Sequence, residues 1–166
     1  GDTFAYGGSS MQFAAAMAER RTGRSWEQLF EQRLATPLEI KSAAWRHPLN
    51  GRPSPMVGGG LMLSLNDLTT FMQMILANGR HGDRQILSPA SVAEIERLQT
   101  GAIQNFRRLP VAKPEWRYGL GVWCERWRAD GACTVSSSAG AFGAFPWIDR
   151  SRGRAGVFLT KAQLPR

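Results

Sequence analysis

The spacing of apolar and polar residues divides the chain into a helical first part and a strand-rich second part. Before residue 102, apolar residues recur at one-turn helical spacing in four segments that capping residues bound. We expect four helices: Ser9–Arg21, the segment from the Ser25 cap to Pro37, the segment from the Ser64 cap to Asn78-Gly79, and the segment from Ser88-Pro89 to Gly101. Residues 41–60, which are rich in Pro and Gly, are expected to be irregular.

Two of these helices carry residues typical of a capping box. Ser25 is followed three residues later by Gln28, and Ser64 is followed by Asp67. A side chain at this spacing returns a contact to the first residue of the helix. We therefore expect Gln28 and Asp67 to complete the caps of their helices.

From Trp116 onward, short runs of aromatic and β-branched residues replace the helical pattern. These runs predict strands over 118–123, 133–138, 142–149 and 155–160, joined as an antiparallel meander after a linker over 102–115. Helices followed by strands indicate the α+β class, with helices packed on an antiparallel sheet. We expect a mainly helical part, 1–115, and a sheet part, 116–166, of one domain of 166 residues.

The segment 136–161 contains an unusual group of small residues between two predicted strands. Ser138-Ala139-Gly140 ends one strand, and Ala141 follows with a backbone N–H that is free to point outward. Small side chains allow a ligand to approach the main chain closely. An ordinary hairpin with tight packing explains the same residues, so the segment alone leaves both interpretations open.

The net charge and the lengths of the apolar runs limit the kinds of binding partner that we expect. The formal charge of +8 comes from 21 Lys and Arg against 13 Asp and Glu, and the excess is arginine spread along the chain. No helix–turn–helix or zinc-finger pattern accompanies it, so we expect a solvated basic surface and no nucleic-acid partner. No apolar run approaches the roughly 20 residues of a membrane span, and no segment resembles a signal peptide.

The two cysteines, Cys124 and Cys133, flank a predicted turn at residues 128–131. On a tight hairpin they could lie opposite each other and form a disulfide, which is typical of an oxidising compartment. Two free, half-buried thiols are an equal alternative. The chain has only His47 and His81 besides, so we expect no zinc site and no cofactor.

The order of motifs resembles the serine β-lactamase and penicillin-binding-protein superfamily, particularly the class C β-lactamase-like esterases and peptidases. The likeness spans nearly the whole chain. It rests on Phe4-x-Tyr6, Thr22-Gly23-Arg24-Ser25, Pro37-Leu38, Gly58-Gly59-Gly60-Leu61, Asn66-Asp67-Leu68, Phe71, Gly79, Ile86-Leu87-Ser88, Tyr118-Gly119-Leu120-Gly121 and Ser138-Ala139-Gly140.

The resemblance implies a site with three elements: Ser-x-x-Lys, Tyr-x-Asn, and Lys-Thr-Gly or His-x-Gly on an edge strand. Tyr6 falls on the tyrosine that carries the proton, and Gly8 falls where the asparagine usually stands. Ser138-Ala139-Gly140 falls on the third element, which binds substrate, and the Ala141 N–H would donate to the oxyanion. Because Ser138 replaces a Lys or His, a cation for a substrate carboxylate is lost, which argues against efficient β-lactam hydrolysis.

The first element, Ser-x-x-Lys, does not occur in this sequence, because Leu38, Pro110 and Phe158 stand three residues before its three lysines. The chain also begins at Gly1. We therefore expect the C-terminal portion of a longer serine hydrolase of esters, amides or lactams, inactive by itself. An N-terminal segment or companion chain would supply the serine and lysine and cover apolar faces of the helices and sheet.

Two other functions remain as alternatives. A non-catalytic binding or scaffold protein that keeps the fold would explain the changes at Gly8 and Ser138. A basic nucleic-acid-binding domain would show steeply salt-dependent binding. The resemblance, together with a disulfide between Cys124 and Cys133 if one forms, favours a periplasmic or other extracytoplasmic location.

Overall fold

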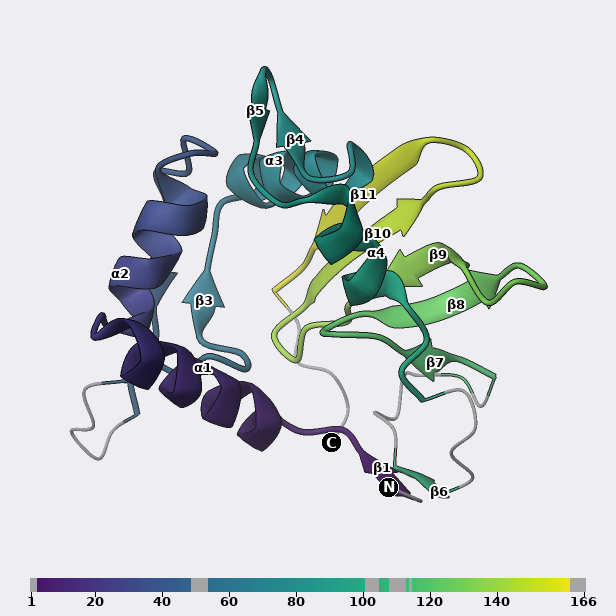
Figure 1. Ribbon diagram of the computed structural model, residues 1–166, viewed down its shortest axis with the longest axis horizontal. Helices are drawn as coiled ribbons and strands as arrows, with labels where there is room; N and C mark the ends of the chain where they lie inside the picture. Colours follow the sequence, from purple (N-terminus) through teal and green to yellow (C-terminus); the bar gives the residue numbers. More distant parts are fainter. Residues whose placement is uncertain (1–2, 49–53, 101–104, 108–112, 114, 162–166) are drawn as a thin grey trace. The chain divides into compact units, whose positions relative to one another are not determined.

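The computed structural model describes residues 3–48, 54–100, 105–107, 113 and 115–161, and it has the expected α+β class (Figure 1). The chain forms two compact units. Residues 1–6 and 71–166 make one, which we call the sheet unit, and residues 7–70 make the other, which we call the helical unit.

The helical unit confirms the first two predicted helices. Its elements are α1 (Gly8–Thr22), α2 (Trp26–Phe30), the π-helix η1 (Glu31–Ala35), β2 (Ala44–Trp45), β3 (Leu61–Met62) and the start of α3 (Leu65–Leu76). The predicted capping box is present, because the Ser25 hydroxyl accepts from the Gln28 N–H while the Gln28 side chain accepts from the Ser25 N–H. Because η1 continues α2 directly, the predicted second helix ends at Ala35, shortly before Pro37.

The predicted role of Asp67 in the α3 cap is wrong. The Ser64 hydroxyl accepts from the Asp67 N–H as expected, but the Asp67 carboxylate accepts from the backbone of Lys41 and from the backbone and hydroxyl of Ser42. The Ser64 N–H then donates to the Ser42 hydroxyl. Asp67 therefore fastens the segment before β2 to the start of α3.

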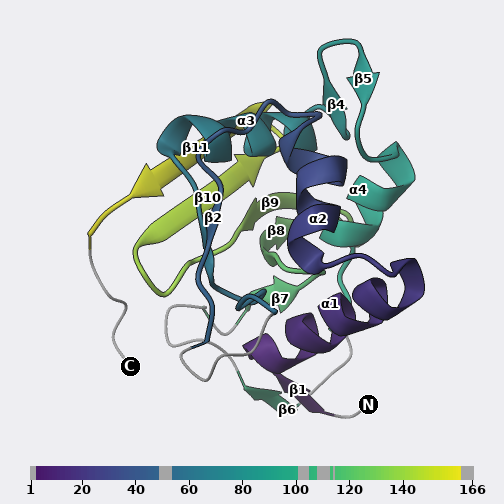
Figure 2. The same ribbon diagram turned by 90° about the vertical axis from the view of Figure 1, so that its left-hand side faces the viewer.

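The sheet unit contains one five-stranded antiparallel sheet in the order β11-β10-β9-β8-β7, which is continuous in both views (Figures 1 and 2). Its elements are β1 (Thr3–Ala5), the end of α3, β4 (Arg80–His81), β5 (Arg84–Gln85), α4 (Pro89–Glu96), β6 (Asn105–Arg107), β7 (Arg117–Tyr118), β8 (Trp123–Trp127), β9 (Cys133–Ser137), β10 (Ala144–Asp149) and β11 (Arg154–Leu159).

Three sequence-based expectations for this unit are corrected. The single strand over 118–123 is two strands, β7 and β8, because a turn closed by the Gly119 N–H and the Val122 carbonyl separates them. The fourth helix ends at Glu96, since Gln99 N–H donates to the Tyr118 carbonyl instead of continuing the helix; Gly101 lies outside the described residues. Within the expected linker, 105–107 form β6, which pairs in parallel with β1.

Cys124 and Cys133 form a disulfide, with their Cα atoms 5.8 Å apart. They are not direct cross-strand partners: Cys124 pairs with Ser136, and Cys133 pairs with Trp127. Two register shifts interrupt the β8–β9 ladder between these positions. A native disulfide of this kind contributes about 2–4 kcal/mol to stability.

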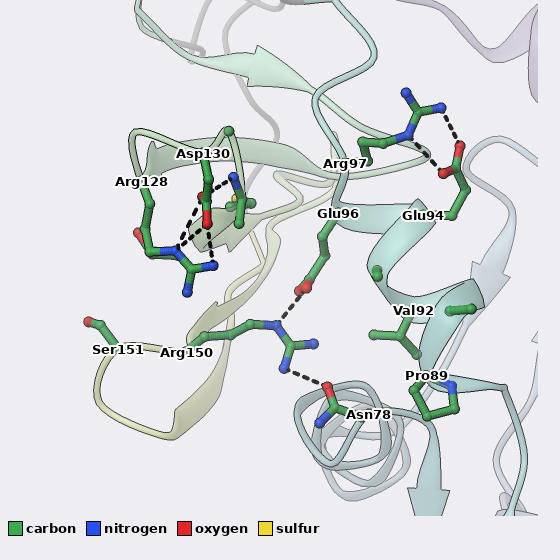
Figure 3. Close-up of a pocket in the computed structure, with 16 residues that line it drawn as sticks. Asn78, Pro89, Val92, Glu94, Glu96, Arg97, Arg128, Asp130, Arg150 and Ser151 are labelled. Atoms are coloured by element: carbon green, nitrogen blue, oxygen red, sulfur yellow. Dashed lines mark hydrogen bonds and ion pairs between the residues drawn. The ribbon is translucent and has the colours of Figure 1, made fainter.

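Arg150, in the turn between β10 and β11, joins three elements of the sheet unit (Figure 3). Its Nε donates to Glu96 of α4 at 2.5 Å, and its Nη atoms donate to the carbonyls of Ile75 and Leu76 at 2.9 and 3.2 Å. Nη1 also donates to Asn78 at 3.2 Å. The guanidinium thus supplies a positive charge and donors to the C-terminal carbonyls of α3, where the helix dipole favours a cation.

We predict that Arg150→Ala lowers the free energy of unfolding by about 3–5 kcal/mol, because it leaves the buried Glu96 carboxylate without its partner. Urea unfolding of the natural protein measures this change. Arg84→Ala, at an exposed position of β5, is the matched control and should change stability by less than about 0.5 kcal/mol. Equal effects of the two substitutions would show that the Arg150 contacts do not join these elements.

Candidate active site

One residue from each strand of the five-stranded sheet lies in a single row across it. The register pairs Tyr118 with Trp123, Trp123 with Ser137, Ser137 with Trp147, and Trp147 with Gly156. Residues paired across antiparallel strands project from the same face, so these five form one stripe of that face. The Trp147 ring occupies the space above Gly156, where an added Cβ atom would lie 2.6 Å from the ring.

Tyr6, the predicted proton carrier, packs against the aromatic end of this row. Its ring centroid lies 5.5 Å from that of Trp123 and 5.6 Å from that of Tyr118. Phe4 and Trp116 complete the aromatic cluster. Phe4 belongs to β1, and Tyr6 follows that strand directly. Tyr6 is therefore held by ring packing within the sheet unit.

The predicted substrate-binding segment continues directly from β9. The Ser138 N–H donates to the Pro146 carbonyl at 3.1 Å, and the Gly140 N–H donates to the Ala144 carbonyl at 2.7 Å. Ala139 is buried. Ala141 is exposed in the following turn, and within the part of the chain that the structure describes its N–H donates to no other group.

Tyr6 and the 138–141 segment belong to the same end of the β8–β9 pair. Trp123, which contacts Tyr6, is the first residue of β8, and its partner Ser137 is the last residue of β9. The chain then passes from Ser137 into Ser138. The sheet unit therefore brings together two of the sequence-predicted elements that lie more than 130 residues apart in the chain.

Gly8, the predicted counterpart of the family's asparagine, is the first residue of α1 in the helical unit. Within that unit it lies beside Gly58, where an added Cβ atom would approach the Gly8 Cα to 2.9 Å. This close packing requires a glycine at position 58, whereas a Cβ atom added at Gly8 would lie 4.0 Å from the Gly58 Cα, an ordinary contact. With no side chain, Gly8 offers only its main chain to a substrate.

Burial raises the pKa of the Tyr6 phenol above its ordinary value of 10.0. Burial, together with the nearby Tyr6 phenol, raises the pKa of Tyr118 to about 12, and the Gly121 N–H opposes this shift. Both shifts favour the neutral phenol. The aromatic rings around Tyr6 carry no positive charge, so a cation that lowers its pKa has to come from another group.

Trp123 and Ser137 were not predicted to belong to the site, because the sequence identifies them only as strand residues. Trp123 is 1% exposed and Ser137 is 2% exposed. The Ser137 hydroxyl is buried without a hydrogen-bond partner among the described residues. The register of the strands shows that both residues lie on the face of the sheet that carries the aromatic cluster. Local residue patterns do not determine this register where the strand pair contains bulges.

A cavity of about 770 Å³ lies elsewhere in the sheet unit, between α4, the β8–β9 turn and Arg150 (Figure 3). Its charged groups are paired with each other: Arg97 with Glu94, Arg128 with Asp130, and Arg150 with Glu96. Arg97 holds the pKa of Glu94 at about 2. None of the predicted site residues lines this cavity, and each charged side chain in its walls has a partner of opposite charge.

Among the described residues, no three His, Cys, Asp or Glu side chains come together as metal ligands would. Nor does any described helix have the length and apolar character needed to cross a bilayer.

A family model described as beta-lactamase matches residues 1–166. The fold is similar to a protein assigned as a beta-lactamase from Bacteroides dorei DSM 17855, with a TM-score of 0.83 and 36% identity over 97% of this chain and 51% of that chain. No curated protein matches the chain.

Two further solved structures share the fold at lower identity. One, assigned as a 6-aminohexanoate-dimer hydrolase from Bacillus anthracis, has a TM-score of 0.79 and 21% identity over 100% of this chain and 40% of that chain. The other, a penicillin-binding protein homologue from Caulobacter crescentus, has a TM-score of 0.66 and 14% identity over 98% of this chain and 54% of that chain. The chain thus spans about half the length of these proteins or less.

We predict that Tyr6 and Tyr118 both titrate above pH 10, with Tyr118 near pH 12, in the sheet unit as described. An unfolded phenol releases its proton at about pH 10, so the contribution of these two tyrosines to stability is constant below that pH and falls as pH rises towards 12. NMR of ring-labelled tyrosine, assigned with Tyr6→Phe and Tyr118→Phe, measures both pKa values. A Tyr6 pKa below 10 would mean that a cation already lies beside the phenol.

We also predict that Ser137→Ala leaves the free energy of unfolding unchanged or raises it by about 1 kcal/mol, because it removes a buried hydroxyl that has no partner. Thr100→Val is the matched control. Thr100 is also buried, but its hydroxyl accepts from the Tyr118 N–H at 2.9 Å, so this substitution should cost about 1–3 kcal/mol. A clear loss of stability in Ser137→Ala would show that its hydroxyl is bonded in the natural protein.

Proposed function

Since the chain belongs to the beta-lactamase family, we propose that it is the C-terminal part of a serine hydrolase, which transfers the acyl group of an ester, amide or lactam to a serine and then to water. The serine and the lysine of Ser-x-x-Lys come from a segment outside residues 1–166 or from a companion chain. The observation that carries the proposal is the contact of Tyr6 with Trp123, whose cross-strand partner Ser137 leads into Ser138–Ala141.

Tyr6 carries the proton in this mechanism. As the serine oxygen attacks the substrate carbonyl, its proton passes to the Tyr6 oxygen, and Tyr6 then protonates the leaving group. Burial alone keeps Tyr6 neutral, so the ammonium group of the family's lysine has to approach the phenol and lower its pKa. Water repeats the sequence on the acyl-serine, with Tyr6 again accepting the proton.

Ala141 stabilises the negative oxygen that forms on the attacked carbonyl. Its N–H lies in an exposed turn and has no partner among the described residues, so it is available to a substrate oxygen. A preorganised backbone donor of this kind typically accelerates acyl transfer by about 100–1,000-fold. The neighbouring Ser138, Ala139 and Gly140 bring the main chain close to the substrate, while Gly8 supplies no amide contact.

The residue at position 138 favours neutral substrates. A serine hydroxyl attracts a substrate carboxylate much less than the Lys or His that the family usually places there. We therefore propose esters and uncharged amides in preference to β-lactams with a carboxylate. The relative from Bacillus anthracis, whose name describes hydrolysis of an amide-linked dimer, is consistent with amide substrates.

Exposed apolar side chains support the proposal that a further segment or a companion chain packs against residues 1–166. Phe13 and Met17 on α1 are 73% and 72% exposed, and Phe158 on β11 is 63% exposed. Such surfaces commonly mark contacts with another chain or segment. The same surfaces would serve the alternative function, a binding protein that keeps the fold without catalysis, which the changes at Gly8 and Ser138 favour.

We predict that Tyr6→Phe lowers kcat of the natural protein by about 100–10,000-fold on a chromogenic ester, because it removes the group that carries the proton. Steady-state hydrolysis of p-nitrophenyl acetate measures this loss. Tyr118→Phe is the matched control, since it changes a phenol in the same cluster and should leave kcat within about threefold.

Two outcomes would contradict the proposal. If Tyr6→Phe hydrolyses the ester as fast as the unmodified protein, Tyr6 does not carry the proton. If the unmodified natural protein hydrolyses neither an ester nor an amide, the binding function replaces the enzymatic one.

A further inference from the structure

The Cys124–Cys133 disulfide joins the two strands that carry the candidate site. Cys124 directly follows Trp123 on β8, and Cys133 is the first residue of β9, the strand that leads to Ser138. Cys124 is 0% exposed and Cys133 is 9% exposed. The bond is therefore inside the protein, and Cys124 stands next to Trp123 in β8, although the side chains of these two successive residues project to opposite faces of the sheet.

The bond lies where the hydrogen-bonded ladder is least regular. The β10–β11 ladder runs without interruption from Ala144–Leu159 to Asp149–Arg154, whereas the β8–β9 ladder contains two register shifts between Cys124 and Trp127. Bulges locally interrupt the ladder of backbone hydrogen bonds. The covalent bond therefore joins β8 and β9 across the stretch where their ladder is interrupted.

The register of this pair determines the geometry of the site. A shift by one residue moves every side chain of a strand to the opposite face. Trp123 would then leave the face on which it contacts Tyr6, and Ser137 would no longer lie opposite it. Tyr6 would lose one of its two neighbouring rings in the sheet, and the turn that presents Ala141 would move with the end of β9.

We propose that the Cys124–Cys133 disulfide is a redox-sensitive positioning element of the Tyr6 site: the bond holds Trp123 against Tyr6, and its reduction by a dithiol lowers acyl transfer without unfolding the protein. The effect on acyl transfer rests on the function proposed above. In the reduction, the S–S bond breaks and two thiols form, while the dithiol gives up two electrons and two protons and becomes a cyclic disulfide.

A bond that only stabilised the fold would behave differently. It would change the free energy of unfolding but not the surroundings of Tyr6 in the folded protein. Tyr118 is the other titratable group of the cluster, and it belongs to β7, which pairs with β8 through Tyr118 and Trp123. A change in the pKa of Tyr6 in the folded protein, measured together with the pKa of Tyr118, would therefore indicate a positioning role. Unchanged pKa values would indicate a role in stability alone.

The test compares the natural protein with and without dithiothreitol, and with the double variant Cys124→Ala/Cys133→Ala, at a temperature where all remain folded by circular dichroism. A bond that stays oxidised in dithiothreitol while the protein is folded would overturn the redox sensitivity, and the double variant then tests the positioning role by itself. Expected results are a kcat lower by about 10–100-fold with KM changed much less, and a Tyr6 pKa nearer to 10. The double variant should show the same values with or without reductant.

A second pair of variants tests the route through Trp123. Trp123→Phe keeps an aromatic ring against Tyr6 and should retain most of the activity, whereas Trp123→Ala should resemble the reduced protein in both kcat and Tyr6 pKa. An unchanged Tyr6 pKa and kcat in the folded double variant would overturn the proposal. If no form hydrolyses any ester or amide but the Tyr6 pKa still changes on reduction, the positioning role stands and the proposed hydrolase function falls.

Discussion

The pairing of β8 with β9 is the constraint on which the candidate site depends. It places Trp123 opposite Ser137, and through these two residues it connects a tyrosine near the start of the chain with a turn near its end. Backbone hydrogen bonds join these two strands on both sides of an interruption in their ladder, and a disulfide crosses the interruption. The geometry available for catalysis is thus a consequence of strand register.

The other end of β9 is held by a different kind of interaction. The Arg150 N–H donates to the Thr134 carbonyl, and the Arg150 side chain reaches Glu96 and the last carbonyls of α3. Loss of one partner from a buried charge pair is strongly destabilising. An arrangement of these elements that separated Arg150 from Glu96 would therefore be disfavoured. The sheet unit therefore has a charged, structural end at Arg150 and an aromatic end, with small residues, at Tyr6.

Much of the fold could be predicted from sequence, because local chemistry determines caps and turns. Ser25 with Gln28, Ser88 with Pro89, and the strand from Cys133 follow from such signals. The errors involve partners distant in the chain. Asp67 binds Ser42 instead of its own helix, β6 forms because β1 pairs with it, and the fourth helix stops where Gln99 pairs with Tyr118.

The same division applies to the site. Motif order identified Tyr6 and Ser138–Ala141, whereas Trp123 and Ser137 became visible only with the register. The family resemblance is confirmed by the match over residues 1–166, and the roles of Tyr6, Gly8, Ser138, Ala139, Gly140 and Ala141 stay predictions. Sequence also could not choose between a disulfide and two thiols, since that choice depends on the distance between bulged strands.

The central claim is that these residues serve an acyl-serine formed on a Ser-x-x-Lys motif outside residues 1–166. The most direct measurement is intact-mass and peptide mass spectrometry of the natural protein after brief reaction with an activated ester and acid quenching. The account predicts one acyl group on the serine of a Ser-x-x-Lys sequence, in a longer chain or a companion chain. A natural protein without such a sequence, or with no acylated serine, would contradict it.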